Sequence, residues 1–303
     1  MRQAQIRAWG EKPTLVDLPE LPPPGAGEVR IRVEATGIHR VVQARAAGKH
    51  YSANTLPHIP GIDGVGVTDR GQRCYFVSFS SGSLADYVNV PRSSLYPVPQ
   101  GVDARQIAAA VNPAMSSWMA LKARTTALPK NFTVLVLGAS SASGRVAIPL
   151  ARALGAKKVI GAARSQATLD TLGLDQTITI ASNVEQTNFG ELDDVDVVLD
   201  YIYGPLTMHL FRSLQTPKPV QYVHIGGLAA TDMTLPGDVL RSKDITIRGS
   251  GPGSWSMEAL SQALPDLLAA MQHVPEQPVK VAQLGDVEKE WEYAGPERLV
   301  FVP

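Results

Sequence analysis

The sequence predicts an α/β fold that contains a doubly wound parallel sheet. The first observation is a series of apolar runs without alternation, such as FTVLVLG and VDVVLDYI, which are typical of strands buried on both faces. The second is the presence of helix-like segments between these runs, such as SGRVAIPLARALGA. The third is a change in the sequence pattern near residue 112, because the pattern before that residue is typical of a β-rich segment. A chain of 303 residues is long enough for two domains of ordinary size.

The first third of the chain is predicted to be β structure. In EVRIRVEATGI the apolar residues Val29, Ile31 and Val33 alternate with charged residues, which indicates a half-buried strand. Short apolar segments broken by Gly, Ser and Pro follow, and they favour a small barrel-like or irregular β unit over helices.

From residue 113 the pattern changes. PAMSSWMALKAR predicts a helix with Pro113 in its first turn. Five strands are then predicted, joined by helix-like segments: FTVLVLG, KKVIGAA, VDVVLDYI, VQYVHIGG and DITIRGS. An amphipathic helix, WSMEALSQALPDLLAAM, and a last strand, RLVFVP, follow them.

Composition excludes several classes of protein. Lys plus Arg and Asp plus Glu both number 28, so no excess charge favours binding to nucleic acid. Cys74 is the only cysteine, which excludes an internal disulfide and a Cys-rich metal site. The N-terminus has no apolar core of a signal peptide, and no run approaches the roughly 18 apolar residues of a membrane span. We therefore expect a cytoplasmic protein that binds neither nucleic acid nor membrane.

Residues 138–144, GASSASG, lie between a predicted apolar strand and a predicted helix. In a doubly wound fold this turn binds pyrophosphate, because small residues let it approach the free N–H groups and the positive dipole end of the helix. The string is not a full G-x-G-x-x-G, so its context carries most of the weight, and a tight turn without a ligand remains an alternative. The candidate cofactor-binding residues of this turn are Gly138, Ser140, Ser141, Ala142, Ser143 and Gly144.

The residues after the next strand indicate which cofactor would bind. An NAD site usually has an acidic residue about 20 positions past the turn. No Asp or Glu occurs here between Gly144 and Asp170, and Arg164 and Ser165 follow the strand instead. A guanidinium suits the 2′-phosphate of NADPH, so we expect NADPH, the alternative being that Arg164 is an ordinary solvated residue. Pro149 falls inside the expected helix and predicts a kink or a displaced helix start.

These segments together resemble a known family. LPHIPGIDGVG resembles the P-x-x-P-G-x-D/E-x-x-G turn, SGSLADYVNVP resembles the G-x-x-A-E-Y segment, and LRSKDITIRGS resembles the last strand of the cofactor domain. In this order and spacing, with the 138–144 turn, the chain resembles the medium-chain dehydrogenase/reductase superfamily, in its zinc-free quinone oxidoreductase (zeta-crystallin-like) branch.

The resemblance implies an architecture. A Rossmann NADP-binding domain, residues 113–250, would be inserted into a GroES-like catalytic domain built from residues 1–112 and 251–303. Family members commonly form homodimers through the edge of the Rossmann sheet. The chain departs from the family in having Ser141 and Ala142 where relatives usually have Gly-Gly, and in the short segment at residues 67–71.

The resemblance also bears on zinc. In the alcohol dehydrogenase branch, zinc ligands occupy the positions that here read Gly37-Ile38-His39 and Gly61-Ile62-Asp63. Of these only His39 could serve as one, whereas a catalytic zinc needs about three protein ligands. We therefore expect no metal.

The implied reaction is hydride transfer from NADPH to a small-molecule quinone or other α,β-unsaturated carbonyl compound, whose developing charge hydrogen-bond donors can stabilise without a metal. The candidate catalytic residues are Tyr51 and His39, with a structural tyrosine and a core histidine as the alternatives. Asn112 and Ser116 correspond to polar groups beside the nicotinamide in relatives, and Gly226 is a further cofactor candidate.

Two other functions remain open. VNPAMSSWMAL resembles the N-P-x-T-A segment of enoyl thioester reductases, and that activity would need a basic rim, for which Arg40, Arg45 and Lys49 are candidates. Proteins of this branch can also bind NADPH without turnover and act as sensors.

Overall fold

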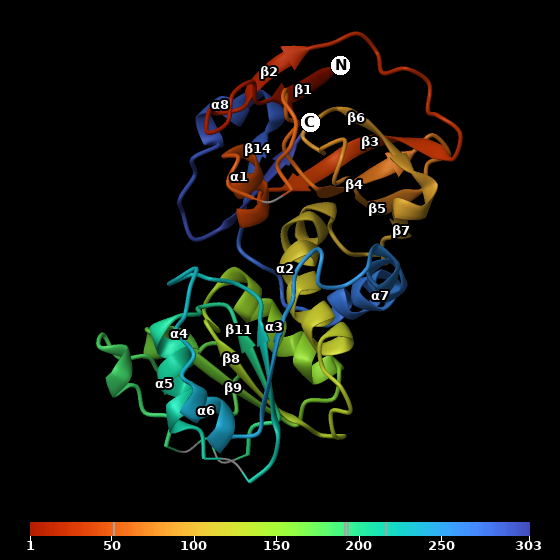
Figure 1. Ribbon diagram of the computed structural model, residues 1–303. Coiled ribbons are helices and arrows are strands. Elements are labelled where there is room, and N and C mark those ends of the chain that lie inside the picture. The colour runs from red at the N-terminus through yellow and green to blue at the C-terminus, as the bar shows by residue number, and fades with distance from the viewer. Residues whose placement is uncertain (51, 191, 193, 216) are drawn as a thin grey trace. The chain divides into compact units, whose positions relative to one another are not determined.

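The computed structural model describes residues 1–303 except 51, 191, 193 and 216. The chain divides into two compact units (Figure 1). Unit 1 comprises Met1–Asn112 and Leu264–Pro303, and unit 2 comprises Pro113–Ala263. The boundaries fall inside two helices, α2 (Ala104–Ala123) and α7 (Met257–Ala270). Each unit is described by itself below.

Unit 2 contains a six-stranded sheet in which every neighbouring pair is parallel. The spatial order is β10-β9-β8-β11-β12-β13, which is the 3-2-1-4-5-6 order of the dinucleotide-binding fold. This confirms the predicted doubly wound sheet. Its strands are β8 (Thr133–Leu137), β9 (Lys158–Ala163), β10 (Gln176–Thr179), β11 (Val197–Asp200), β12 (Val220–His224) and β13 (Ile245–Gly249).

Both faces of this sheet are buried, which explains the apolar runs. In β8, Leu135 and Leu137 belong to a core with residues of α5 and α6, whereas Val134 and Val136 belong to a second core with residues of α3. Each fully buried aliphatic side chain stabilises the unit by about 1.5–3 kcal/mol. The helical segments are α3 (Ala142–Ala153), α4 (Gln166–Leu169), η2 (Val184–Gln186), α5 (Pro205–Ser213) and α6 (Gly237–Ser242).

Unit 1 is β-rich, as predicted. Its main sheet has the order β14-β15-β3-β4-β5-β7, with β6 also paired to β3, and all pairs except β14–β15 are antiparallel. The strands of unit 1 are β1 (Arg2–Gln5), β2 (Thr14–Asp17), β3 (Glu28–Gly37), β4 (Asp63–Thr68), β5 (Arg73–Val77), β6 (Tyr87–Pro91), β7 (Leu95–Pro97), β14 (Val279–Gln283) and β15 (Arg298–Val302). Its short helical segments are α1 (Arg40–Ala46), η1 (Arg92–Ser94), η3 (Met271–His273), η4 (Leu284–Asp286) and α8 (Val287–Glu290).

Two segments far apart in sequence meet in this sheet. β15 lies antiparallel to β3, with Val300 opposite Gly37 and Phe301 opposite Thr36. In β3 the predicted alternation is confirmed, because Val29, Ile31 and Val33 are buried.

Pro113 lies at another helix position than predicted, and Pro149 lies inside a helix whose start is not displaced. α2 begins at Ala104, nine residues before Pro113, because Asp103 accepts a hydrogen bond from the N–H of Arg105 (2.7 Å) and starts the helix there. Likewise α3 begins at Ala142 and continues past Pro149, so its start is not displaced. An interior proline costs about 3 kcal/mol, and the burial of Ile148 and Leu150 on either side of it offsets that cost.

None of the described helices is long and apolar enough to span a membrane. Cys74 is buried in β5, and burial raises the pKa of its thiol to about 11.

Candidate functional site

The turn between β8 and α3 fits a phosphate group closely. Gly138 has a φ of +87°, a left-handed conformation that glycine adopts without strain. A Cβ atom on Gly144 would lie 2.2 Å from the carbonyl oxygen of Gly138, so no side chain fits there. Both glycines of the predicted turn are therefore required by the path of the backbone.

The start of α3 completes this turn. Ser141 is the N-cap residue, and its Oγ accepts a hydrogen bond from the N–H of Gly144 (3.0 Å). Nε of Arg145 donates to the carbonyl oxygen of Ser140 (3.0 Å) and holds the loop from the other side. The backbone N–H groups of Ala142 and Ser143, in the first turn of the helix, have no partner within the helix. These groups and the positive end of the helix dipole suit a pyrophosphate.

Arg164 and Ser165 lie on the same edge of the sheet as this turn. β8 and β9 are parallel neighbours, with Leu137 opposite Ala162, so the residues that follow both strands emerge side by side. Arg164 is exposed. Ser165 caps α4 and accepts a hydrogen bond from the N–H of Thr168 (3.2 Å). A free guanidinium beside the turn suits a 2′-phosphate.

A buried carboxylate organises the next strand end, and the sequence analysis missed it. Asp200, at the end of β11, is fully buried and accepts hydrogen bonds from the N–H groups of Ile202 (2.7 Å) and Tyr203 (3.0 Å). It also accepts from the hydroxyls of Tyr222 (2.7 Å) and Thr207. Burial and the charge of Asp200 raise the pKa of Tyr222. Asp200 thus fixes the loop between β11 and α5.

The ring of Tyr203, in that loop, packs against the ring of His224 at the end of β12. Tyr203 has a φ of +62°, which is uncommon for a residue with a side chain and marks a strained position. Its ring lies 4.2 Å from the ring of His224, measured between centroids. Burial lowers the pKa of His224. An acidic and an aromatic residue directly after an apolar strand, Asp200-Tyr201, is the signal that could have identified this edge.

Ser116 and Gly226 both lie next to Tyr201. The hydroxyl oxygens of Ser116 and Tyr201 are 3.3 Å apart, and the N–H of Gly226 donates to the carbonyl oxygen of Asp200 (3.1 Å). A Cβ atom on Gly226 would lie 3.4 Å from the carbonyl oxygen of Tyr201. Burial raises the pKa of Tyr201 to about 12. Asn112, the last residue of the first segment of unit 1, is half-buried on α2.

In unit 1, His39 belongs to a cluster of buried polar side chains. Its Nε2 lies 3.5 Å from Oδ1 of Asp63, and the hydroxyl of Tyr75 donates to Oδ2 of the same carboxylate (2.7 Å). Only 3% of His39 and 2% of Asp63 are exposed, and neither ring nitrogen of His39 has a hydrogen-bond partner among the described residues. Burial and the neighbouring Asp63 raise the pKa of Tyr75. The structure thus places His39 beside an acid that the sequence analysis had not linked to it, whereas Tyr51 lies outside the described residues.

Gly37 makes room for this cluster. A Cβ atom there would lie 2.8 Å from Cε1 of His39 and 2.1 Å from the carbonyl oxygen of Ala108. Among the described residues, no three His, Cys, Asp or Glu side chains are grouped as a metal site would require.

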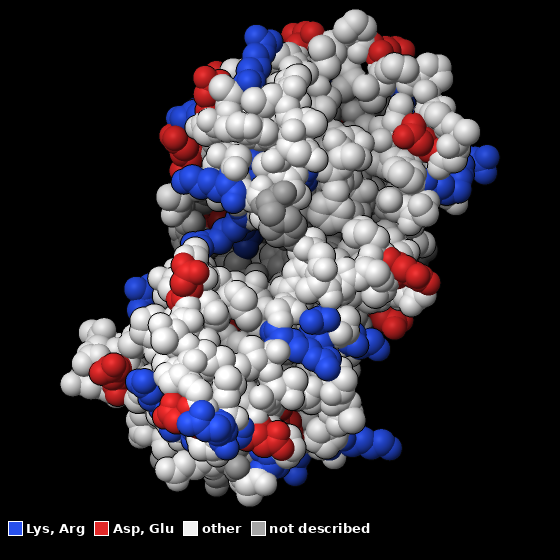
Figure 2. Space-filling view, in the orientation of Figure 1, with Lys and Arg blue, Asp and Glu red and all other residues white. Residues whose placement is uncertain are grey.

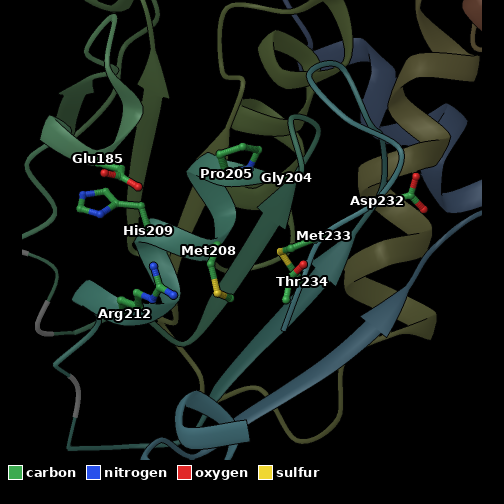
Figure 3. A pocket seen from close by; sticks show the side chains of 9 residues that line it. All are labelled: Glu185, Gly204, Pro205, Met208, His209, Arg212, Asp232, Met233 and Thr234. Carbon is green, nitrogen blue, oxygen red and sulfur yellow. The ribbon is translucent and has the colours of Figure 1, made fainter. Parts of the chain in front are cut away.

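A groove of about 550 Å³ lies elsewhere on unit 2 (Figure 3). It is lined by residues of η2, α5 and the segment 232–234, with His209 and Arg212 projecting from α5. Glu185 and Asp232 bring negative charges to the same groove, and none of the predicted site residues lines it. The groove therefore does not define a ligand class.

Comparison with known proteins places this geometry in context. The chain is 36% identical to a probable NADPH-dependent quinone reductase, tdiC, of Emericella nidulans, over 89% of this chain and 90% of the relative. The quinone oxidoreductase of Thermus thermophilus, solved alone and in complex with NADPH, is 27% identical, with a TM-score of 0.82 over the full length of both chains.

Other comparisons are less specific. An NAD-dependent alcohol dehydrogenase is 22% identical and has a TM-score of 0.83 over both full chains, which shows the shared fold alone. No family model matches the sequence. Because the chain covers 90% of a relative to which it is 36% identical, and shares its whole fold with the Thermus enzyme, it belongs to the quinone oxidoreductase (zeta-crystallin-like) branch of the medium-chain dehydrogenase/reductase superfamily.

Proposed function

We propose that this chain is an NADPH-dependent oxidoreductase that transfers a hydride to a quinone or another α,β-unsaturated carbonyl compound without zinc. The observation that carries the proposal is the edge of the unit 2 sheet, where the 138–144 turn lies beside an exposed Arg164 and no acidic residue occurs between the end of β9 and Asp170. The similarity to the probable quinone reductase of Emericella and the quinone oxidoreductase of Thermus supports it.

Different residues of unit 2 would bind different parts of the cofactor. The N–H groups at the start of α3 would bind the pyrophosphate, and Arg164 with Ser165 would bind the 2′-phosphate through charge-assisted hydrogen bonds. Ser116, Gly226 and, from unit 1, Asn112 would position the nicotinamide. NADPH, when bound, supplies the hydride.

Residues of unit 1 would supply the proton and stabilise the negative charge that develops on the substrate. We propose that His39 holds or delivers a proton at a ring nitrogen, and that Asp63 orients the ring. Tyr51 would donate a hydrogen bond to the substrate oxygen. A conjugated acceptor spreads the incoming charge onto that oxygen, so hydrogen-bond donors can stabilise it.

The domain roles and the assembly are proposals as well. Residues 113–250 would form the NADP-binding domain, and residues 1–112 with 251–303 the catalytic domain. The protein would form a homodimer, which sedimentation of the purified chain tests directly.

The decisive experiment is a titration of the purified protein with NADPH and NADH, followed by tryptophan fluorescence. We expect NADPH to bind more tightly. Arg164→Ala should weaken NADPH binding about 10- to 100-fold, because charge-assisted hydrogen bonds contribute about 1.5–3 kcal/mol, and should leave NADH binding nearly unchanged. Arg152→Ala, which removes a cation paired with Asp175, is the matched control. Equal losses for both cofactors would remove the role assigned to Arg164.

Turnover is tested separately with a panel of quinones, enones and enoyl thioesters. We expect NADPH oxidation with the quinones or enones, and a lower rate with unchanged NADPH affinity in Tyr51→Phe. Oxidation with the thioesters alone would identify an enoyl thioester reductase. NADPH binding without turnover on any acceptor would instead identify a non-catalytic sensor.

A further inference from the structure

Arg45 is a buried cation whose donors are only partly used. Only 7% of the residue is exposed, and Nη2 donates to the carbonyl oxygen of Phe79 (2.7 Å). Nε and Nη1 have no hydrogen-bond partner among the described residues. Burial lowers the pKa of Arg45, and none of the described carboxylates offsets that effect. The side chain therefore differs from the other cations of the predicted basic run, Arg40 and Lys49, which are exposed.

A buried guanidinium with unused donors is unfavourable unless another group, of opposite charge, pairs with it. A guanidinium stays protonated at any ordinary pH, so it cannot escape burial by losing its charge. Removing such an ion from water costs several kcal/mol when no opposite charge compensates it. A single neutral carbonyl, that of Phe79, supplies one hydrogen bond and no countercharge.

The surroundings of Arg45 contain further bases. His50 and His58 both have a lowered pKa, because of burial first and the charge of Arg45 second. The pKa of His58 falls to about 4, so its ring is neutral at pH 7 and retains one N–H donor. Nδ1 of His50 lies 2.8 Å from Oγ of Ser52.

Segments from several parts of unit 1 enclose this cluster. Trp9 packs on His58, with 5.7 Å between ring centroids, and also covers the end of α1, because a Cβ atom on Gly48 would lie 2.8 Å from its Cγ. Phe79 follows β5 and contributes the one carbonyl that Arg45 contacts. The donors of Arg45 are thus held in a fixed, largely dry place, where a charge-assisted hydrogen bond is strong.

We propose that Arg45, with His58, binds an oxyanion group of a small molecule, either a carboxylate or a phosphate. The guanidinium supplies the countercharge and the donors on Nε and Nη1, and the neutral imidazole of His58 supplies a further N–H donor. Arg45 and His58 belong to unit 1, whereas the 138–144 turn and Arg164 belong to unit 2, so anion binding and cofactor binding can be tested by separate substitutions.

A polyanion is a poor fit for this site. Arg45 is buried, and the chain has no net charge. On the face shown in Figure 2, basic and acidic side chains are interspersed, and large areas carry neither. Recognition by one enclosed guanidinium favours a single anionic group over an extended backbone of phosphates.

Thermal unfolding in the absence of cofactor tests the proposal. Wild-type protein is unfolded in sodium phosphate, sodium acetate and sodium chloride at matched ionic strength. A ligand that binds only the folded state raises Tm with concentration. We expect phosphate or acetate to raise Tm by a few degrees above chloride, and the more effective of the two identifies the anionic group. A wild-type Tm equal in all three salts overturns the proposal.

Arg45→Met and Arg40→Met separate a specific site from a general salt effect. Arg40→Met removes an exposed cation from the same helix and should keep the full anion-dependent shift. Arg45→Met should abolish that shift, and in chloride its Tm should equal or exceed that of the wild type, because an uncompensated buried charge has been removed. An equal anion-dependent shift in wild type and Arg45→Met would assign the effect to another site and overturn the proposal.

Two further measurements guard against a misfolded variant. Arg45→Lys keeps the charge without the guanidinium and should retain a smaller anion-dependent shift. NADPH affinity should be unchanged in Arg45→Met. A Tm loss in Arg45→Met that is the same in chloride, phosphate and acetate, in a protein that still binds NADPH, would show that Arg45 only supports the Phe79 loop.

Discussion

The two polar arrangements proposed to carry the chemistry are built in opposite ways. The 138–144 turn of unit 2 consists of consecutive residues, and its ligand-binding groups belong mainly to the backbone. The cluster of His39, Asp63 and Tyr75 in unit 1 consists of side chains from three separate segments, brought together by sheet pairing. The first depends on small residues and on the direction of one helix. The second depends on close contacts between ionisable groups, one of them the hydrogen bond from Tyr75 to Asp63, so the two should respond differently to substitution and to pH.

Gly144→Ala should give the largest effect. Its Cβ atom would lie 2.2 Å from the carbonyl oxygen of Gly138, so the turn must move. We expect NADPH affinity to fall at least 100-fold and unfolding stability to fall by about 3 kcal/mol, as for other overpacked sites. Gly249→Ala is the control, because its Cβ atom would meet nothing within 4 Å. Urea unfolding and fluorescence titration measure both quantities. Normal NADPH binding by Gly144→Ala would show that the backbone of the turn is not the binding element.

Lowering the pH should reduce the stability of unit 1. It should leave the 138–144 turn unaffected, because that turn contains no titratable side chain. The folded-state pKa of His58 is about 4, below its ordinary value of 6.5. Between these two pKa values the unfolded chain binds more protons than the folded protein. The contribution of neutral His58 to the free energy of unfolding is therefore complete above about pH 6.5 and is lost as the pH falls to about 4. The loss is about 3 kcal/mol. In His58→Phe the urea midpoint should depend less on pH over this range, whereas the exposed control His273→Phe should behave as wild type.

Tyr75→Phe tests the side-chain cluster alone. It removes the hydrogen bond to Asp63 and leaves that buried carboxylate with one donor fewer. We expect a loss of about 2 kcal/mol of unfolding stability, because hydrogen bonds to charged groups contribute about 1.5–3 kcal/mol. NADPH affinity should not change. Tyr87→Phe, at an exposed tyrosine of the same unit, should have little effect. If Tyr75→Phe weakens cofactor binding as much as it weakens the fold, the two arrangements are not independent.

Substitutions of Ser141 should give the smallest effect. They separate the contribution of this residue to unfolding stability from its contribution to NADPH affinity. Ser141→Ala removes the N-cap hydrogen bond to Gly144 and should cost about 1 kcal/mol. Ser141→Asp restores a capping oxygen and should recover that stability, yet its negative charge opposes a pyrophosphate. NADPH affinity should therefore be lower in Ser141→Asp than in Ser141→Ala. The reverse order would argue against an anion at this helix terminus.

This contrast also explains how much the sequence could predict. The parallel sheet and its turn were predictable because both are local: apolar runs become strands, and a string of small residues before an amphipathic helix becomes the turn. β10 was missed because this edge strand, QTIT, buries only Ile178 fully and lacks an apolar run. The start of α2 differs from the prediction because proline suits the first turn of a helix, whereas here the side chain of Asp103 caps the backbone N–H of Arg105 and the helix begins at Ala104.

The partners of His39 could not be predicted by the same means. Asp63 and Tyr75 meet because β4 and β5 pair with Val65 opposite Tyr75, and register of this kind depends on the whole sheet. Asp200 was hidden for a related reason. It ends an apolar run that identifies a strand, and the four hydrogen bonds described above for its carboxylate group come from residues up to 22 positions away. The local pattern therefore predicts where a ligand-binding edge lies, but not which side chains meet there.

The pairing of β15 with β3 has a consequence for how the protein is made. A ribosome releases β3 early and its partners β4 and β6 soon afterwards, but its third partner, β15, emerges only after more than 250 further residues have been synthesised. Unit 2 is a continuous segment and has all of its strands before Arg298–Val302 exists as a peptide. During synthesis unit 2 can thus fold first, while the end of β3 at Thr36 and Gly37 lacks its β15 partner and stays open to aggregation or to a chaperone.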